Sequence, residues 1–243
     1  HAWMLTGVRG VGKTTTARIL ARALNFETED GSGAPTVDLA TEGVHCRAIM
    51  EGRHPDVIEM DAASHTGIDD IRDIIDSSRY GPVSARFKVY IIDEVHMLSK
   101  QAFNGLLKTL EEPPAHVKFV FATTEIRKVP VTVLSRCQRF DLRRIGAEQL
   151  QAYFSEILDK EGVAAEPEAV GMIARAADGS ARDGLSLLDQ AIAQGAPVGD
   201  KPFIAAANVR EMLGLADRSS VVDILEAAFA GEGPRMLEGL EAA

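Results

Sequence analysis

Eight residues near the start of the chain form a pattern that is typical of phosphate binding. Residues 7–14 read GVRGVGKT, which matches G-x-x-x-x-G-K-[ST] at every fixed position. Glycines let such a loop curl so that backbone N–H groups point at phosphates, and the helix that follows adds its positive dipole end. We expect Lys13 to reach the β- and γ-phosphates of ATP and the Thr14 hydroxyl to bind Mg²⁺, which prefers oxygen ligands. The residues expected to contact the nucleotide are Gly7, Val8, Arg9, Gly10, Val11, Gly12, Lys13, Thr14 and Thr15.

Two carboxylates follow a second apolar run. Residues 88–94 read KVYIIDE, so Asp93 and Glu94 stand at the end of an expected strand. The carboxyl ends of parallel strands meet at the edge of a sheet where ligands bind. Adjacent strand residues point in opposite directions, and we therefore expect different roles. Asp93 is predicted to support Mg²⁺, and Glu94 is predicted to orient and polarise the attacking water.

The phosphate loop is compatible with other reactions. Kinases also use such loops, so transfer of the γ-phosphoryl group to a small molecule is one alternative, although a carboxylate after Asp93 favours water as the acceptor. A nucleotide-gated scaffold that binds ATP without hydrolysing it is a second alternative, and Glu94 argues against it. A phosphate-release assay would separate an ATP hydrolase from a kinase and from a non-hydrolysing scaffold.

The elements that must position these residues alternate along the first part of the chain. Apolar runs predict five strands, at residues 3–6, 57–60, 87–92, 119–123 and 139–142. Helical patterns lie between them, at residues 14–24, 68–78 and 99–112. This alternation predicts an α/β fold, with a five-stranded parallel sheet covered on both faces by helices. The third helix has Ser99 as an expected N-cap, an apolar stripe through Leu106 and Leu110, and Pro113-Pro114 after its end.

Strand patterns stop after Ile145, and helical periodicity takes over. We therefore predict a core domain at 1–144, with an irregular insertion at about 25–45, and a helical domain at 145–196. A Gly/Pro-rich stretch at 195–202 separates the start of a third helical domain at 200–243. The chain begins with His1 inside a strand-like run and stops without a clear cap, so we expect it to be a fragment.

Composition narrows the classes of protein further. Hydrophobic residues make up 46% of the 243 residues and charged residues 26%, which is ordinary for a globular protein. No run of about 18 apolar residues occurs, and the first residues lack a secretory pattern, so we expect a cytoplasmic protein with no membrane association. Cys46 and Cys137 are expected to be free thiols. The formal net charge of −10 argues against a free-standing nucleic-acid binder.

Further motifs make the chain resemble the AAA+ clamp-loader ATPases of bacterial DNA polymerase III. They are DEVHMLS at 93–99, LLKTLEEPP at 106–114, FATTE at 121–125 and LSRC at 134–137. The resemblance covers the chain to about Gly195. It implies an enzyme that hydrolyses ATP within the polymerase holoenzyme and loads the sliding clamp onto primed DNA. It also implies a heteropentameric spiral of clamp-loader subunits and a helical lid after the core. Another AAA+ replication or repair ATPase is the alternative within the fold.

The resemblance implies roles for three more residues. In this family a polar residue after the fourth strand senses the γ-phosphate, and Thr124 stands at the matching place. The arginine of the Ser-Arg-Cys motif, here Arg136, acts in trans on ATP held by the adjacent subunit. Its planar guanidinium suits phosphate oxygens. Arg182 matches the lid arginine that senses the γ-phosphate, although an ion pair with Asp178 or Asp183 is the alternative.

The chain departs from the family in two places. Relatives commonly carry a four-cysteine zinc module after the first helix, whereas this chain has only Cys46 there, with His45 and His54 nearby. One thiolate cannot make a tetrahedral site, so we expect no structural zinc. Relatives often have basic residues after the second strand, where this chain has His-Thr-Gly at 65–67. Other candidate phosphate contacts on DNA are Arg72, Lys100 and Lys108.

Overall fold

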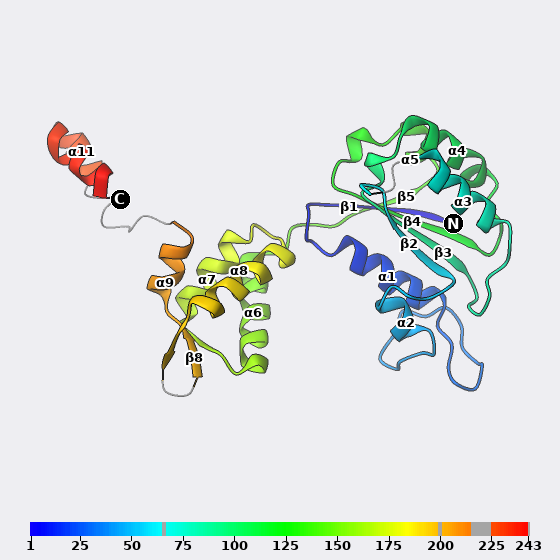
Figure 1. Ribbon diagram of the computed structural model, residues 1–243, viewed down its shortest axis with the longest axis horizontal. Helices are drawn as coiled ribbons and strands as arrows, with labels where there is room; N and C mark the ends of the chain where they lie inside the picture. The colour runs from blue at the N-terminus through cyan, green and yellow to red at the C-terminus, as the bar shows by residue number, and fades with distance from the viewer. Residues whose placement is uncertain (65–66, 199–200, 215–224, 243) are drawn as a thin grey trace. The chain divides into compact units, whose positions relative to one another are not determined.

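The computed structural model describes residues 1–64, 67–198, 201–214 and 225–242 (Figure 1). Its internal contacts divide the chain into two compact units, residues 1–143 and 144–243. Within the described ranges, none of the helices combines the length and the apolar character that crossing a membrane requires.

A five-stranded parallel sheet forms the centre of the first unit, with the strand order β2-β3-β4-β1-β5 (Figure 1). The strands are β1 (Ala2–Thr6), β2 (Val57–Asp61), β3 (Lys88–Asp93), β4 (Val117–Thr123) and β5 (Gln138–Asp141). The predicted α/β fold is confirmed, and the predicted strand ends differ from these by one or two residues. Since β4 lies between β1 and β3, residues that follow β4 lie between the loop after β1 and the carboxylates after β3.

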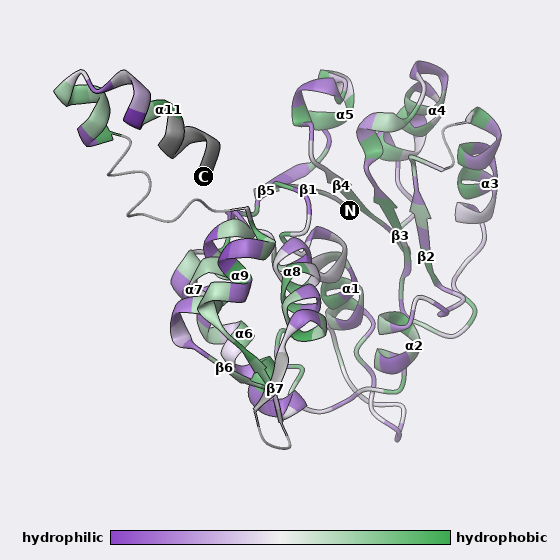
Figure 2. Cartoon of the chain, turned by 60° about the vertical axis from the view of Figure 1, so that its left-hand side comes forward, coloured by the Kyte–Doolittle hydropathy of each residue, from purple (hydrophilic) through white to green (hydrophobic). Residues whose placement is uncertain are grey.

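Helices cover both faces of the sheet, and each face has its own apolar core. Helices α1 (Lys13–Leu24) and α2 (Cys46–Met50) pack on one face with strand residues such as Ile91. Helices α3 (Ile68–Ser78) and α4 (Lys100–Glu111) pack on the other with strand residues such as Tyr90. Figure 2 shows β3 and β4 coloured mainly as hydrophobic, as expected of strands that are buried on both sides. The short elements of this unit are η1 (Val95–Met97), η2 (Ile126–Lys128) and α5 (Val131–Leu134).

Helix α4 follows the carboxylates at the end of β3 and packs its apolar face against the sheet. The Ser99 side chain caps it by accepting a hydrogen bond from the Ala102 N–H at 3.2 Å, as the sequence predicts. Phe103, Leu106 and Leu110 are buried against the sheet. Helix α4 therefore begins at a fixed point shortly after Glu94.

The second unit contains four packed helices around a separate core. They are α6 (Ala147–Glu161), α7 (Pro167–Ala176), α8 (Ala181–Gln194) and α9 (Ala206–Met212). Helices α6 and α8 approach closely at Gly184, where a Cβ atom would lie 2.2 Å from the Phe154 ring. Glycine is needed there because the buried ring occupies that space. Helix α11 (Gly233–Ala242) follows near the end of the chain, and residues 215–224 of the predicted third domain lie outside the described residues.

The expectation that strands end at Ile145 is wrong. A small sheet in the second unit has the order β6-β8-β7, formed by β6 (Ala164–Ala165), β7 (Ala196–Val198) and β8 (Lys201–Ile204). These strands are two to four residues long, so they are too short to carry the alternating pattern from which strands are predicted. The Gly/Pro-rich stretch at 195–202 thus contributes paired strands and does not act only as a spacer.

Candidate nucleotide-binding site

The phosphate-loop pattern lies between β1 and α1. Gly10 and Gly12 have φ angles of 73° and 95°, in the left-handed region that glycine adopts without steric cost. Gly7 lies against the chain that follows β5, and a Cβ atom there would be 2.7 Å from the Leu142 carbonyl oxygen. The loop therefore requires glycine for space at its start and for backbone conformation at its two later turns.

Lys13 is the first residue of α1, and its side chain lies over the loop. The buried Lys13 Nζ donates hydrogen bonds to the carbonyl oxygens of Gly7 at 3.1 Å and Val8 at 2.9 Å. The amino end of a helix carries a positive partial charge and N–H groups with no partner within the helix. The ammonium group and the helix end together favour an anion at this loop. Thr15, in the first turn of α1, is exposed.

Thr14 and Asp93 meet although they are 79 positions apart in sequence. The Thr14 Oγ1 donates a hydrogen bond of 2.5 Å to the Asp93 Oδ2. The other carboxylate oxygen of Asp93 accepts a hydrogen bond from the Glu94 N–H at 2.8 Å. A hydroxyl oxygen and a carboxylate oxygen in contact form a donor set that suits Mg²⁺, which keeps several waters and takes the rest of its ligands from phosphates.

The side chain of Glu94 points in a different direction from that of Asp93, because the backbone turns at Glu94. Strand β3 ends at Asp93, and Glu94 adopts φ 45° and ψ 44°, a left-handed conformation that is uncommon outside glycine. The strand alternation that we used to separate the two side chains therefore does not apply to Glu94. Its Oε2 accepts hydrogen bonds from the Thr124 N–H at 3.1 Å and the Thr124 Oγ1 at 3.0 Å. The carboxylate of Glu94 is thus tied to the end of β4.

His96 also belongs to this cluster, and sequence reasoning did not single it out. Its side chain is 6% exposed, and its Nδ1 lies 3.0 Å from the Thr123 Oγ1 and 3.3 Å from the Glu94 Oε2. Its Nε2 lies 3.5 Å from the Glu125 Oε1. The Lys128 ammonium lowers the pKa of Glu125, and His96 adds to that effect. The sequence signal that could have identified His96 is its position, three residues after Asp93, in what the structure shows to be the one-turn helix η1.

Arg136 follows α5 and lies at the surface of the first unit. Its guanidinium donates to the Thr132 carbonyl oxygen at 2.5 Å and forms an ion pair with Glu111 at the end of α4. Its side chain is 30% exposed. In the described part of the chain, its partners come from α4, α5 and the adjoining Ser135, and the structure does not bring it to the phosphate loop.

Arg182 lies in the other unit, in the first turn of α8. It is exposed, and its carbonyl oxygen accepts a hydrogen bond from Ser186 Oγ. The alternative ion pair with Asp178 or Asp183 is not formed among the described residues, and Asp178 pairs with Arg144. Helix α8 begins after Ser180, which caps it by accepting from the Asp183 N–H at 3.1 Å.

Cys46 and two histidines lie at and after the end of the insertion, and each has a polar contact. The buried Cys46 Sγ accepts from the Gly43 N–H at 3.2 Å. The Nε2 of His54 lies 2.9 Å from the Nδ1 of His45, and the Nε2 of His45 lies 3.6 Å from the Glu27 Oε2. No set of three or more His, Cys, Asp or Glu side chains suited to a metal occurs in the described ranges.

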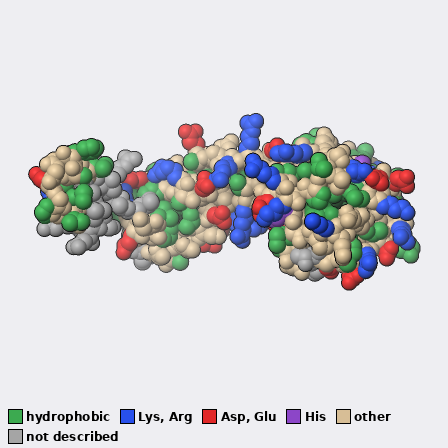
Figure 3. All heavy atoms as spheres, turned by 90° about the horizontal axis from the view of Figure 1, so that it is seen from above, with side chains coloured by type: hydrophobic (Ala, Val, Ile, Leu, Met, Phe, Trp, Pro, Cys, Tyr) green, Lys and Arg blue, Asp and Glu red, His purple; other side chains and the backbone are tan. Residues whose placement is uncertain are grey.

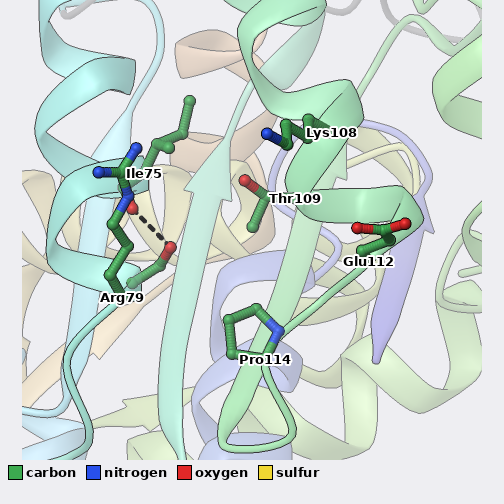
Figure 4. Close-up of a pocket in the computed structure, with 7 residues that line it drawn as sticks. Ile75, Arg79, Lys108, Thr109, Glu112 and Pro114 are labelled. Carbon is green, nitrogen blue, oxygen red and sulfur yellow. Dashed lines mark hydrogen bonds between the residues drawn. The ribbon is translucent and has the colours of Figure 1, made fainter.

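The candidate DNA contacts are spread over the surface. Arg72 pairs with Asp69 at 2.7 Å. Lys108 lines a groove of about 300 Å³ between α3 and α4, together with Arg79 and Glu112 (Figure 4). On the face drawn in Figure 3, Lys and Arg side chains lie among Asp and Glu side chains. Gly67 precedes α3, and residues 65–66 lie outside the described residues.

The fold and the site define a class of protein, the P-loop nucleoside triphosphatases of the AAA+ type. A solved structure of the RuvB Holliday junction branch migration motor from Thermotoga maritima matches with a TM-score of 0.61 and 18% identity, over 93% of this chain and 67% of that one. This similarity supports the fold alone. Family models match along the chain: DNA polymerase III, delta subunit, over residues 1–146; the clamp loader subunit ATPase lid domain over 149–197; and gamma and tau domain III over 204–243.

The chain belongs to the family of DNA polymerase III gamma and tau subunits. It is 48% identical to DNA polymerase III subunit tau of Salmonella typhimurium over 237 residues, which is 98% of this chain and 35% of that protein. It is 51% identical to subunit tau of Bacillus subtilis over 192 residues, or 79% of this chain and 33% of that protein. The resemblance to clamp-loader ATPases is confirmed, and the chain spans about a third of these relatives.

Proposed function

We propose that this chain is an ATP-hydrolysing motor subunit of the replicative clamp loader, which loads the sliding clamp onto primed DNA. The observation that carries the proposal is the meeting of Thr14 with Asp93, next to a Glu94 carboxylate tied to Thr124. Three separate segments of sequence thereby supply a phosphate loop, a metal-binding pair and a candidate base at one edge of the sheet.

Binding of the nucleotide is assigned to the loop and its lysine. Backbone N–H groups of residues 7–12 and the Lys13 ammonium would contact the phosphates. Thr14 and Asp93 would hold Mg²⁺, whose contribution is to neutralise charge that develops on the β- and γ-phosphate oxygens. The Lys13 ammonium has to exchange the loop carbonyls for phosphate oxygens when ATP binds, because its Nζ donates to those carbonyls now.

Hydrolysis is assigned to Glu94, with Thr124 as the residue that positions it. Both hydrogen bonds from Thr124 go to the Oε2 of Glu94, so we assign the Oε1 to the attacking water. The carboxylate would orient this water and accept its proton. The Thr124 hydroxyl lies between the loop and β3 in the sheet order, which is also where a γ-phosphate sensor is needed.

Two arginines are assigned to steps that require other parts of an assembly. Arg136 would contact the γ-phosphate of ATP bound to the adjacent subunit, where its planar donors spread positive charge over the phosphate oxygens. Arg182 would close the helical lid onto the γ-phosphate of the same subunit. ATP binding would then order a spiral of clamp-loader subunits that holds an open clamp, and hydrolysis triggered by primed DNA would release it. The net charge of −10 fits contact with DNA only inside such an assembly.

The proposal is tested on the full-length protein assembled with its partner subunits. ATPγS with Mg²⁺ should bind in a one-to-one ratio to each intact phosphate loop. ATP turnover should rise when the sliding clamp and primed DNA are both added. Turnover that does not respond to the clamp would indicate another AAA+ replication or repair ATPase, and binding without phosphate release would indicate a nucleotide-gated scaffold.

A further inference from the structure

His96 is a buried polar side chain at the point where the ends of β3 and β4 meet. Val95 before it and Leu98 two positions after it are buried in the apolar core, and its own side chain is 6% exposed. Burying an imidazole costs free energy unless its polar atoms find partners. A leucine or phenylalanine at this position would avoid that cost, so the contacts of the ring indicate what the histidine does.

The ring contacts both neighbours of Thr124. Its Nδ1 lies 3.0 Å from the Thr123 Oγ1, and its Nε2 lies 3.5 Å from the Glu125 Oε1. Thr124 stands between these two residues and presents its N–H and its hydroxyl to Glu94. The imidazole therefore spans the segment whose two donors fix the Glu94 carboxylate.

The Thr123 hydroxyl joins the ring to the end of β4. Its Oγ1 accepts from the Glu125 N–H at 3.0 Å and also contacts the His96 Nδ1 at 3.0 Å. The other ring nitrogen, Nε2, faces the Glu125 carboxylate. Both ring nitrogens therefore face polar groups at the end of β4.

His96 also lies against the carboxylate itself. Its Nδ1 is 3.3 Å from the Oε2 of Glu94, the same oxygen that accepts from Thr124. The ring and Glu94 are both attached to the turn after β3, since η1 begins directly after Glu94. Glu94 is held in a left-handed conformation, and the contact with the His96 ring limits how the turn can relax.

We propose that His96 is a positioning residue for hydrolysis, which locks the end of β4 to the turn after β3 so that Thr124 keeps Glu94 in place. The proposal rests on the proposed function of Glu94 as the base. His96 touches neither the phosphate loop nor the Thr14–Asp93 pair in any contact described above. Its loss should therefore lower the turnover number and leave the affinity for nucleotide unchanged.

The test uses the assembled clamp-loader complex with the full-length chain, and compares three substitutions of His96. His96→Leu removes both nitrogens and keeps the volume of the site. His96→Asn retains a polar atom near the position of Nδ1, and His96→Gln retains one near Nε2. His116→Leu is the matched control, because its ring also has a polar partner, the Ser78 carbonyl oxygen at 3.0 Å from its Nε2, but lies next to the opposite end of β4.

We expect His96→Leu to lower kcat by about tenfold, the scale of one lost buried hydrogen bond, while KM for ATP and the Kd for ATPγS change less than about twofold. His96→Asn should recover most of kcat, and His96→Gln should recover less, because the shorter contact is at Nδ1. His116→Leu should match the wild type. The melting temperature of each variant shows whether it is folded, and if His96→Leu does not fold, the Asn and Gln variants decide.

Three results would overturn the proposal. The first is a kcat of His96→Leu equal to that of the wild type. The second is an Asn variant no more active than the Gln variant, and the third is a parallel loss of nucleotide affinity; either of these two would give His96 a packing role only. A wild-type complex that releases no phosphate would instead contradict the proposed function of the chain, so the two failures are distinguishable.

Discussion

Two regions of the first unit collect polar side chains, and they do so in different ways. At the nucleotide site, Thr14, Asp93, Glu94 and Thr124 come from the ends of neighbouring strands and the helix after the loop, and the sheet fixes their spacing. In the insertion, the residues between Phe26 and His45 form no helix or strand. The Gly43 N–H donates to Cys46 at the start of α2, and His45 contacts His54. Substitutions at the strand ends should therefore affect chemistry, and substitutions in the insertion should affect stability.

The first effect concerns nucleotide binding in Lys13→Ala. The substitution removes the ammonium that lies over the loop carbonyls, and ATP binding should be lost, with Kd raised by about 100-fold or more, as expected for an ionised contact to phosphate. Isothermal titration with ATPγS and Mg²⁺ measures this. Lys118→Ala is the matched control, because Lys118 donates to the Ala115 carbonyl near the other end of β4, and its Kd should not change.

The next effect concerns Arg136 in the assembled complex. Arg136→Ala should lower turnover by about 10³-fold at the site of the adjacent subunit, which is the scale of a removed arginine finger. The mutant subunit's own affinity for ATP should stay the same. Arg139→Ala, three positions along and paired with Asp141, is the control and should have no effect on turnover. Loss of hydrolysis only in the mutant subunit's own site would refute the assignment in trans.

A smaller effect is expected from pH on the insertion. Burial lowers the pKa of His54, and the neighbouring His45 lowers it further, while Asp56 opposes the shift. A histidine with a lowered pKa in the folded state contributes stability above its unfolded pKa of about 6.5, and this contribution is lost as the pH falls. Glu27 faces His45 from the other side. Thermal unfolding between pH 7.5 and pH 5 should therefore be less pH-dependent for His54→Gln than for the wild type, and equal pH dependence would contradict this account.

The insertion should also contain no bound zinc. Cys46 contacts a backbone N–H, and the nearest histidines contact each other, so a tetrahedral set of ligands is not assembled. Metal analysis of protein purified without chelators measures the content directly. A reproducible ratio of one zinc per chain would show that the histidines and acidic side chains rebuild a site, and the comparison between the two regions would have to be revised.

Much of this site could be predicted from sequence because its parts follow strong local patterns. The phosphate loop, the apolar strand before Asp93 and the cap at Ser99 all carry short-range signals. The direction of Glu94 could not be predicted, since it depends on a left-handed turn that the strand pattern does not encode. His96 lay within a recognised motif, but its role depends on contacts with β4 that only the sheet order creates. The small sheet of the second unit was not predicted, because its strands are too short to show an alternating apolar pattern.

The most direct test of the account is ATP turnover by the assembled complex that carries Glu94→Gln. The amide preserves the shape of the carboxylate and can still accept from Thr124, but it cannot accept a proton from water. ATPγS affinity should be unchanged, and turnover should fall by about 10²-fold or more, the scale of a lost general base. Thr124→Val in the same complex should give an intermediate rate. Turnover of Glu94→Gln equal to that of the wild type would contradict the assignment of hydrolysis to this edge of the sheet.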